Sequence, residues 1–362
     1  MKITEVQTIP IDPTRHAVLG YLVLVKTDAG IDGIGEIAAD CYPDTVAFVI
    51  RRMQLEGRDP MAIEALWQSL YQGTFWRGGP IYTSAVSGVE QALWDIKGKA
   101  LGAPVYQLLG GKVNERIKLY THTHFLSQTP DEFATSAAEA VALGYEAVKF
   151  DPLGEAHQRL GIEEMRMAVE RVRATREAVG PDIDILIEGH GRLSPNAAIR
   201  VGRLLEEFEP FFFEEPVPPE NPAEMAKVAT SIGIPLAAGE RLYTRWAFRE
   251  LLEQQVIDYV QPDLCHCGGF LEGYRIAMMA ETYHVRVMPH NPNGPISTLV
   301  GLHLGACTAN FEMLEYPRRP ADAVSVLRGE PEVEDGHLAV PEGPGWGVEL
   351  DEELLTGFEP EV

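Results

Sequence analysis

Three short apolar runs, each ending in a glutamate, recur at a fixed interval in the middle of the chain. The runs are Asp184–Glu188, Pro210–Glu214 and Ile234–Glu240. Each has the length of a buried strand. The interval from Glu188 to Glu214 is 26 residues, and the interval from Glu214 to Glu240 is also 26. The intervening residues fit helices, and Ser194-Pro195 has the composition of a helix start. The sequence therefore predicts a repeated strand–helix unit.

A helical crossover makes successive strands parallel, and the functional side chains of parallel α/β folds lie at the carboxyl ends of the strands. Glu188, Glu214 and Glu240 should therefore converge on one point. Three oxygen ligands suit a hard divalent cation, so we expect Mg²⁺ to bind there. The alternative is that acidic residues follow strands by chance, because loops are polar. Three glutamates that each end an apolar strand at the same interval favour the metal site over chance.

The strand–helix alternation extends from residue 117 to residue 315 at mostly 23 to 30 residue spacing. Its eight strand-like runs are Ile117–His122, Ala147–Asp151, Asp184–Glu188, Phe211–Glu214, Leu236–Glu240, Tyr259–Asp263, Val285–His290 and Phe311–Glu315. Eight such units describe a TIM-type α/β barrel. The pattern decays after Tyr316, so the last strand should lack a full helix. This predicts a modified barrel of the (β/α)₇β kind.

The first part of the chain has a different rhythm. Three strands are expected at Ile3–Pro10, Tyr21–Lys26 and Gly33–Ile37, and helices at 43–54, 60–72 and 83–101. This predicts an N-terminal α+β domain over residues 1–112 and a catalytic barrel over 113–320. Residues 321–362 should form a C-terminal segment that returns to the first domain.

Composition excludes several classes of function. A formal net charge of -24 argues against nucleic-acid binding, which needs a basic surface. No apolar run approaches the length of a membrane span, and the N-terminus lacks a signal-peptide core, so we expect a cytoplasmic protein without membrane contact. The four cysteines form no disulfide framework, and Cys265-His266-Cys267 lacks the second cysteine pair of a zinc site.

Almost every predicted barrel strand ends in an ionisable residue. Asp263 and His290 end consecutive strands, so the carboxylate should orient the imidazole and raise its basicity. The alternative for a lone histidine is a hydrogen-bonded core residue. His190 should share the face of Glu188, because side chains two apart on a strand point the same way. Two acid–base groups would then flank a cation that stabilises an enediolate.

The order of these motifs resembles the mandelate racemase subgroup of the enolase superfamily. The matching motifs are Lys149-x-Asp151, Glu188-x-His190-Gly-Arg, Glu214-Glu-Pro, Gly239-Glu240, Gln261-Pro-Asp263, Pro289-His290 and Leu314-Glu315. Superfamily members use a lysine or histidine base with Mg²⁺. Within the subgroup, Phe75–Gly79, Lys149–Pro152 and His190–Arg192 look most like gluconate and galactonate dehydratases.

The resemblance implies a role for each residue. Glu188, Glu214 and Glu240 would bind Mg²⁺. His290, oriented by Asp263, would take the proton beside the carboxylate, and His190 would help the C3 hydroxyl to leave. Glu315 would hydrogen-bond the substrate carboxylate, either protonated or sharing a proton. Lys149 would contact that carboxylate or Asp151, and a buried ion pair is its alternative.

The implied reaction is dehydration of a sugar acid, an aldonate such as gluconate or galactonate, to a 2-keto-3-deoxy acid. Asp151 stands where racemases carry a second lysine base, which favours dehydration over racemisation. Glu188 stands where the family more often has Asp. A racemase, an epimerase or a lactonising cycloisomerase is the closest alternative activity. A metal-binding scaffold without turnover is the alternative from another class.

The resemblance also implies a substrate pocket and an assembly. The N-terminal domain would act as a capping domain, whose loops Thr14–Gly20 and Ala38–Asp44 cover the mouth of the barrel. The predicted substrate-binding residues are Tyr42, Trp76, Arg77, His122 and Asp151, and further candidates include His16, Phe75, His124, Tyr243, Arg245 and Asn291. Related capping domains pack together, so a homo-oligomer between a dimer and an octamer is expected.

Overall fold

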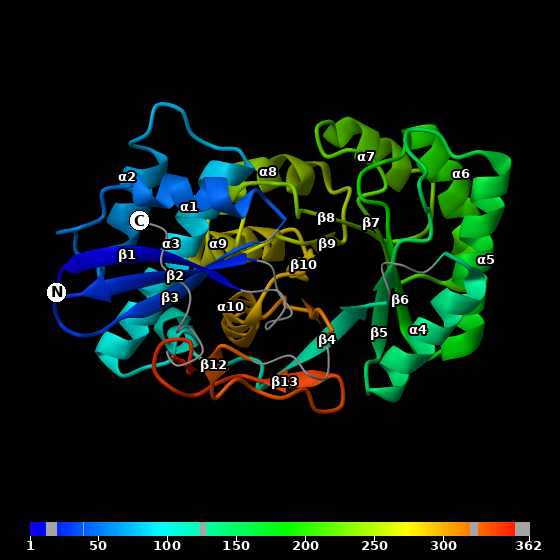
Figure 1. Cartoon of the computed structure of the whole chain (residues 1–362). Coiled ribbons are helices and arrows are strands. Elements are labelled where there is room, and N and C mark those ends of the chain that lie inside the picture. The colour runs from blue at the N-terminus through cyan, green and yellow to red at the C-terminus, as the bar shows by residue number, and fades with distance from the viewer. Residues whose placement is uncertain (12–19, 39, 124–127, 319–324, 352–362) are drawn as a thin grey trace.

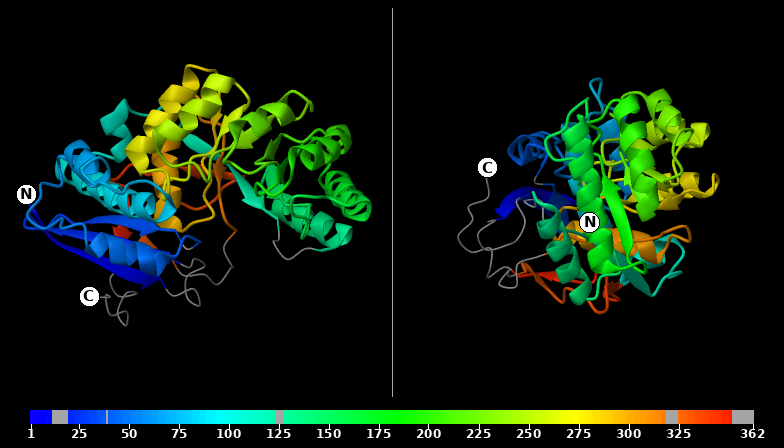
Figure 2. Two further views of the ribbon diagram at one scale, coloured as in Figure 1. Left: turned by 90° about the horizontal axis from the view of Figure 1, so that it is seen from above. Right: turned by 90° about the vertical axis from the view of Figure 1, so that its right-hand side faces the viewer.

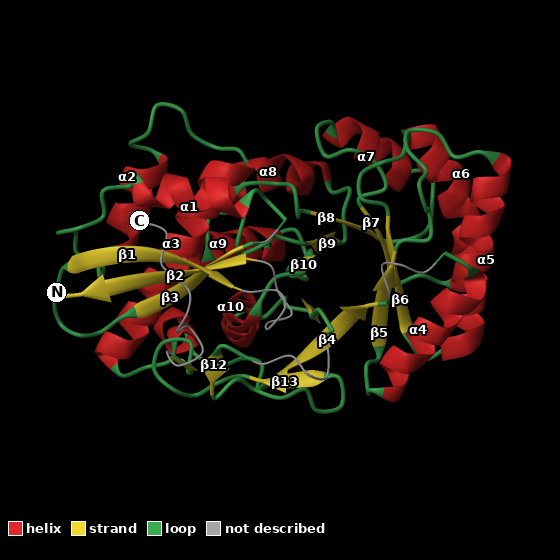
Figure 3. Cartoon of the chain, viewed as in Figure 1, coloured by secondary structure: helices red, strands yellow, loops and turns green. Residues whose placement is uncertain are grey.

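The computed structural model describes residues 1–11, 20–38, 40–123, 128–318 and 325–351. The N-terminal region is an antiparallel sheet in the order β1-β2-β3 with three helices beside it (Figure 3). The strands are β1 (Ile3–Ile11), β2 (Gly20–Thr27) and β3 (Gly33–Ile37), and the helices are α1 (Pro43–Arg51), α2 (Ile63–Tyr71) and α3 (Pro80–Leu101). All six elements were predicted, with ends that differ by a few residues.

Eight parallel strands form the barrel, seen to the right of the N-terminal sheet in Figure 1. They are β4 (Arg116–His122), β5 (Ala147–Phe150), β6 (Asp184–Glu188), β7 (Phe212–Glu214), β8 (Leu236–Ala238), β9 (Tyr259–Val260), β10 (Arg286–Val287) and β11 (Leu314–Glu315). The sheet runs in sequence order from β4 to β10, and β11 pairs with β4. A bridge from Val287 to Phe311 joins the two ends. The predicted barrel is confirmed.

Seven helices connect these strands and lie outside them (Figure 2). They are α4 (Pro130–Ala142), α5 (Ile162–Val179), α6 (Pro195–Leu205), α7 (Pro222–Ala229), α8 (Thr244–Gln254), α9 (Phe270–Glu281) and α10 (Pro295–Ala306), and two short 3₁₀ helices are η1 (Val105–Leu109) and η2 (Glu206–Phe208). Helix α4 begins with a capping box between Thr129 and Glu132, and Ser194 caps α6 by accepting from Ala197 N. The helix start predicted at Ser194-Pro195 is confirmed.

The barrel interior is layered because inward-facing side chains alternate along each strand. A small buried cluster fills the lower layer with Tyr120, Ala147, Leu186, Phe212, Ala237, Met288 and Met313. Two residues further along six of these segments stand His122, Lys149, Glu188, Glu214, His290 and Glu315. An apolar floor therefore carries a layer of ionisable groups at the carboxyl ends of the strands.

Two buried carboxylates of the N-terminal domain cap helices of the barrel. Glu36 in β3 accepts hydrogen bonds from the backbone N–H groups of Gly294, Ile296 and Ser297 at the start of α10. Glu90 in α3 accepts from Phe270 N at 2.7 Å and Leu271 N at 3.0 Å at the start of α9. Helix N-termini favour negative charge, so these contacts stabilise both domains at their interface.

The C-terminal segment touches both parts of the molecule. Strand β13 (His337–Ala339) pairs antiparallel with β4, and β12 (Leu327–Arg328) pairs with β14 (Glu349–Leu350). Trp346 is fully buried and donates its indole N–H to Ile34 O at 3.1 Å. Its backbone N–H donates to Asp95 Oδ1 at 3.0 Å. The segment therefore lies on the barrel as well as on the N-terminal domain.

His303 should make stability fall in acid. It is fully buried in α10, accepts from Tyr106 N at Nδ1 and contacts Trp346 O through Nε2, both at 3.2 Å. Burial lowers the pKa of His303 to about 4. In the unfolded chain the histidine has its ordinary pKa of about 6.5, so below that pH the unfolded chain binds a proton that the folded state does not bind. The stability of the folded state therefore falls from about pH 6.5 towards pH 4.

Denaturant unfolding at pH 5 and pH 7 tests this prediction. His303→Gln should be less stable than the wild type at pH 7, because two buried contacts are weakened, but should lose less stability on going to pH 5. Parallel losses in the two proteins would show that His303 does not contribute to the acid dependence.

Candidate active site

The three predicted metal ligands meet at the carboxyl ends of β6, β7 and β8. One carboxylate oxygen from each of Glu188, Glu214 and Glu240 lies within 4.8 Å of the other two. Glu188 and Glu214 are buried, and Glu240 is slightly exposed at the mouth of the barrel. The register of the parallel pairs places Glu188 directly beside Glu214. The three carboxylates that recur at a fixed interval in the sequence therefore lie close together in the structure.

Lys149 stands at the centre of this layer and is buried. Its Nζ lies 2.8 Å from Glu214 Oε2, 3.2 Å from Glu188 Oε2 and 3.3 Å from Glu315 Oε1. Burial lowers the pKa of Lys149, but the carboxylates of Glu214 and Glu315 outweigh burial and raise it well above the usual range. Lys149 is thus a cation in a buried ion pair, the alternative considered from the sequence, and not a partner of Asp151.

The cluster fits a hard divalent cation. Glu214 Oε1 is buried and has no hydrogen-bond partner among the described residues. Burial and the neighbouring Glu188 raise the pKa of Glu214 to about 7 even though Lys149 lowers it. One lysine therefore leaves negative charge uncompensated. Carboxylate oxygens are the ligands Mg²⁺ prefers, so Glu188, Glu214 and Glu240 would hold it.

His290 forms a dyad with Asp263. His290 Nδ1 lies 2.8 Å from Asp263 Oδ2, and His290 Nε2 lies 3.2 Å from Glu240 Oε2. The Asp263 carboxylate also accepts from Asn293 Nδ2 at 3.0 Å and from Cys265 N at 2.7 Å. Three contacts fix the position of the Asp263 carboxylate, and it orients the imidazole ring. Nε2 is thereby turned towards the metal cluster.

His190 forms a second dyad on the other side of the cluster. His190 Nδ1 lies 2.7 Å from Asp151 Oδ2, which also pairs with the guanidinium of Arg192. His190 has a φ of 48°, a left-handed conformation, and its backbone N–H donates to Glu188 Oε1 at 2.7 Å. This turn places the ring beside the metal cluster. The two predicted acid–base histidines therefore each have their own aspartate.

Glu315 is surrounded by hydrogen-bond donors, and its expected role, protonated or sharing a proton at the substrate carboxylate, stays a prediction. It is fully buried, and it contacts His122 Nε2, Lys149 and the Tyr120 hydroxyl, the last at 3.1 Å. The backbone N–H of Asn291 donates to it at 2.9 Å. Burial raises the pKa of Glu315, but Lys149 and His122 lower it well below the usual range. The donors around Glu315 were not foreseen, because they come from three separate segments.

A cavity of about 210 Å³ opens beside the second dyad. It brings together two of the predicted substrate-binding residues, His122 and Asp151, with His190 and Glu188. The other lining residues are Thr123, Gln128, Phe133, Phe150, Gly154, Glu155 and Arg171. Arg171 uses its guanidinium on Gln128 O and Pro152 O, so it supports the wall. Only the strand-end residues of this cavity could be found from the sequence.

The other three predicted substrate-binding residues do not line this cavity. Tyr42 and Trp76 are 71% and 84% exposed, and Arg77 donates to Gln72 Oε1. No contact between these three and the carboxylate cluster occurs in the described part of the chain, so their role stays a prediction. The candidates His16 and His124 lie outside the described residues.

The sequence did not reveal an ion pair at the mouth of the barrel between the buried Glu215 and the partly exposed Arg241. Glu215 pairs with Arg241, whose Nε lies 2.7 Å from Glu215 Oε2 and 3.5 Å from Glu240 Oε1. Burial and Glu240 raise the pKa of Glu215 to about 8. Glu215 follows a predicted ligand directly, and Arg241 follows another, so their proximity could have been inferred from the 26-residue interval.

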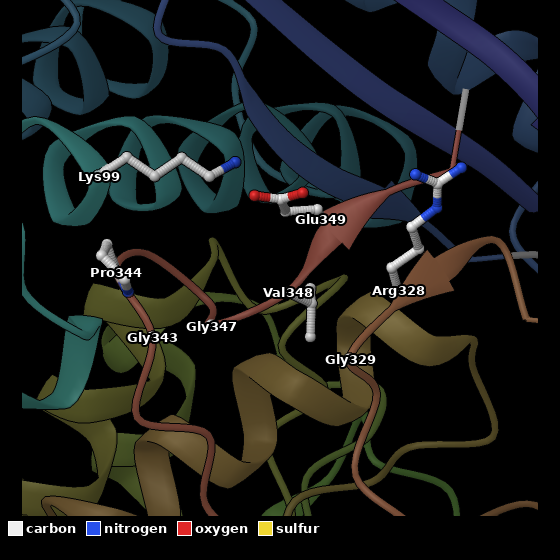
Figure 4. Close-up of a pocket in the computed structure, with 8 residues that line it drawn as sticks. All are labelled: Lys99, Arg328, Gly329, Gly343, Pro344, Gly347, Val348 and Glu349. Atoms are coloured by element: carbon white, nitrogen blue, oxygen red, sulfur yellow. The ribbon is translucent and has the colours of Figure 1, made fainter. Parts of the chain in front are cut away.

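A larger cavity of about 590 Å³ lies between α3 and the C-terminal segment (Figure 4). Lys99 and Glu349 extend into it from opposite sides in the close-up. Lys99 Nζ already contacts Asp95 Oδ2 at 2.6 Å and Asp32 O at 3.0 Å, and Arg328 pairs with Asp351. This cavity holds neither a metal cluster nor a histidine dyad among its lining residues, so it is not the candidate active site.

Known families match both parts of the chain. Residues 4–110 match the mandelate racemase/muconate lactonizing enzyme N-terminal domain, and residues 132–354 match the enolase C-terminal domain-like family. The chain belongs to the mandelate racemase/muconate lactonizing enzyme family. The predicted membership in the enolase superfamily is thus confirmed, and the barrel ends that carry Glu188, His190 and His290 lie in the second matched region.

Curated relatives of this family member cover nearly the whole chain. It is 39% identical to a D-galactonate dehydratase of Xanthomonas euvesicatoria pv. vesicatoria, over 98% of this chain and 94% of the relative. It is 36% identical to a D-galactonate dehydratase of Ralstonia nicotianae with the same coverage.

Solved structures agree with the fold of this family member. An enolase-superfamily protein of Salmonella Typhimurium superposes with a TM-score of 0.94 at 37% identity, over 99% of this chain and 98% of that one. A mandelate racemase/muconate lactonizing enzyme-like protein of Roseovarius superposes with a TM-score of 0.90 at 35% identity, over 100% and 96%. None of the described helices could span a membrane.

Replacing one cluster carboxylate should weaken Mg²⁺ binding. Glu214→Gln keeps the size of the side chain but removes its charge, so the affinity for Mg²⁺ should fall at least about 100-fold, the upper range seen for second-shell changes. Isothermal titration calorimetry of the full chain measures this. Glu163→Gln, at an exposed carboxylate, is the control and should bind as the wild type does. An unchanged affinity in Glu214→Gln would contradict the ligand assignment.

Proposed function

We propose that this protein is a Mg²⁺-dependent hydro-lyase that removes water from an aldonate and forms a 2-keto-3-deoxy acid. The observation that carries the proposal is the pair of histidine–aspartate dyads on opposite sides of one carboxylate cluster. Their Nδ1 atoms lie 2.8 Å from Asp263 and 2.7 Å from Asp151. The names of the relatives support the same reaction class, and D-galactonate is the first substrate to test.

His290 is the base in this proposal. The proton on C2, next to the carboxylate, would pass to His290 Nε2, because Nδ1 is engaged by Asp263. Asp263 stabilises the imidazolium that forms, as a carboxylate partner does for other histidine bases. Mg²⁺ bound to Glu188, Glu214 and Glu240 would offset the negative charge that develops on the substrate carboxylate. The fixed cation of Lys149 lies in the same layer and adds to that effect.

His190 is the acid. It would donate a proton to the C3 hydroxyl, which leaves as water while the C2–C3 double bond forms. The resulting enol takes a proton at C3 and becomes the 2-keto-3-deoxy acid. Asp151 holds the ring of His190, and Arg192 holds Asp151 with a second contact to Gly154 O at 2.6 Å. In this proposal His190 serves the leaving group, and the absence of a second lysine in the carboxylate layer of the described residues supports dehydration over two-base racemisation.

The side cavity supports a hydroxylated substrate. It begins at Glu188 and His190 and is lined by polar groups of His122, Thr123 and Gln128. An aldonate bound at the cluster through its carboxylate would direct the carbons beyond C3 past His190 and into this cavity. The predicted small-molecule sugar acid partner is therefore retained in the proposal. The cytoplasmic location and the homo-oligomer stay predictions.

Product formation tests the proposal. The full chain is incubated in D₂O with Mg²⁺ and a panel of aldonic and aldaric acids, beginning with D-galactonate and D-gluconate, and proton NMR follows each. The expected result is loss of the C2 proton with the appearance of a 3-deoxy methylene. Exchange at C2 without loss of water would replace dehydration by racemisation or epimerisation. An absence of change with every acid would contradict the proposed substrate class.

Replacement of each histidine should affect the rates of C2 exchange and dehydration differently. His290→Asn removes the base, so both C2 exchange and dehydration should fall by about 10²–10⁴-fold, the range of general acid–base catalysis. His190→Asn removes only the acid, so dehydration should fall similarly while C2 exchange persists. Proton NMR in D₂O measures both rates in one sample. Equal loss of exchange in the two variants would contradict the separate roles.

A further inference from the structure

His266 is a buried histidine that the proposed mechanism does not use. It lies three residues after Asp263, in the loop between β9 and α9, and is only 6% exposed. We propose that His266 is a positioning residue, a fixed imidazolium that links Asp40 of the capping domain to the Asp263–His290 dyad. The proposal rests on the proposed function for its catalytic consequence, but the charge of His266 stands on contacts alone.

The Nδ1 atom of His266 carries a proton. It lies 2.7 Å from Ser84 Oγ, in the first turns of α3. Ser84 donates its single hydroxyl proton back to Pro80 O, as hydroxyls in helices often do. The Ser84 oxygen must therefore accept from His266, which makes Nδ1 the donor of this hydrogen bond.

The Nε2 atom of His266 carries a proton as well. It lies 3.2 Å from Asp40 Oδ1 and 4.0 Å from Asp263 Oδ2. A lone pair at Nε2 would point at two carboxylates and be repelled by both, whereas an N–H donates to Asp40. With protons on both nitrogens the ring is an imidazolium.

The surrounding groups agree with a charged ring. The titratable groups that face His266 are Asp40, Asp263, His290 and, beside Asp40, Cys41. Burial lowers the pKa of His266, but Asp263 and Asp40 outweigh burial and raise it. Burial raises the pKa of the Cys41 thiol, which stays neutral. The hydrogen bond from His266 lowers the pKa of Asp40.

The cation acts on the reaction through Asp263. Its Nε2 atom lies 4.0 Å from the Asp263 carboxylate that orients His290, and the backbone N–H of His266 donates to Asp263 O at 3.0 Å, which fixes the loop. Asp40 belongs to the loop that follows β3, and Ser84 belongs to α3. The capping domain is therefore tied to the catalytic dyad by one charged residue, and loss of either contact should disturb the orientation of His290.

Nitrogen-15 NMR of the histidine rings tests the charge without any substrate. In the full chain labelled at histidine, the His266 signals, assigned by their absence in His266→Asn, should show two protonated ring nitrogens at pH 7.5. Asp40→Asn should make His266 lose its proton at lower pH. Asp59→Asn, which removes a capping-domain carboxylate that instead accepts from Met61 N, should leave the signals unchanged. A neutral His266 ring at pH 7.5 would overturn the proposal.

The catalytic part is tested by kinetics on the acid that the wild type dehydrates. His266→Asn should lower kcat by about 10-fold or more, as outer-sphere partners do, with little change in KM or in Mg²⁺ affinity. Asp40→Asn should lower kcat less, because His266 and its Asp263 contact remain. A wild-type kcat in His266→Asn would overturn the positioning role. If the wild type dehydrates no acid, the proposed function fails, while the NMR result still decides the charge of His266.

Discussion

Burial of negative charge is the constraint on which this structure depends. An ionised carboxylate is costly to remove from water unless hydrogen bonds or a nearby cation compensate it. Several buried carboxylates have partners from the protein: helix N-termini for Glu36 and Glu90, and Arg245 for Glu272. At the mouth of the barrel the protein supplies too few such partners for the carboxylates. Lys149 is one cation among several carboxylates, and Glu214 keeps an oxygen without a partner. That deficit is the physical reason to place a divalent cation there.

The capping domain contributes to the site through the same kind of contact. Glu36 fixes the start of α10, which follows directly after the segment that carries His290. Glu90 fixes the start of α9, which follows the loop that carries Asp263. Both elements of the dyad are therefore anchored from behind by carboxylates of another domain. A change in this interface would therefore reach His290 without touching it, so the first domain supports the dyad to which we assign catalysis.

The regular part of this molecule could be predicted from its sequence, and the irregular part could not. The 26-residue interval of Glu188, Glu214 and Glu240 gave the parallel strands and their convergence, because a period in sequence becomes a position on the barrel. The Asp263–His290 dyad followed from strand order, whereas the pairing of His190 with Asp151 was not foreseen. Partners that approach from loops or from the other domain, such as Asp40 at His266, carry no periodic signal. The donors around Glu315 were also missed, because they come from three segments.

We expect one cation to occupy the space between Glu188, Glu214 and Glu240. Anomalous scattering from a crystal of the full chain grown with Mn²⁺, which takes similar oxygen ligands, tests this assignment. A strong anomalous peak should be bounded by these three carboxylates, with Lys149 turned towards Glu315 or the substrate position. A peak elsewhere, or no peak at saturating Mn²⁺ with the three side chains in the same cluster, would contradict it.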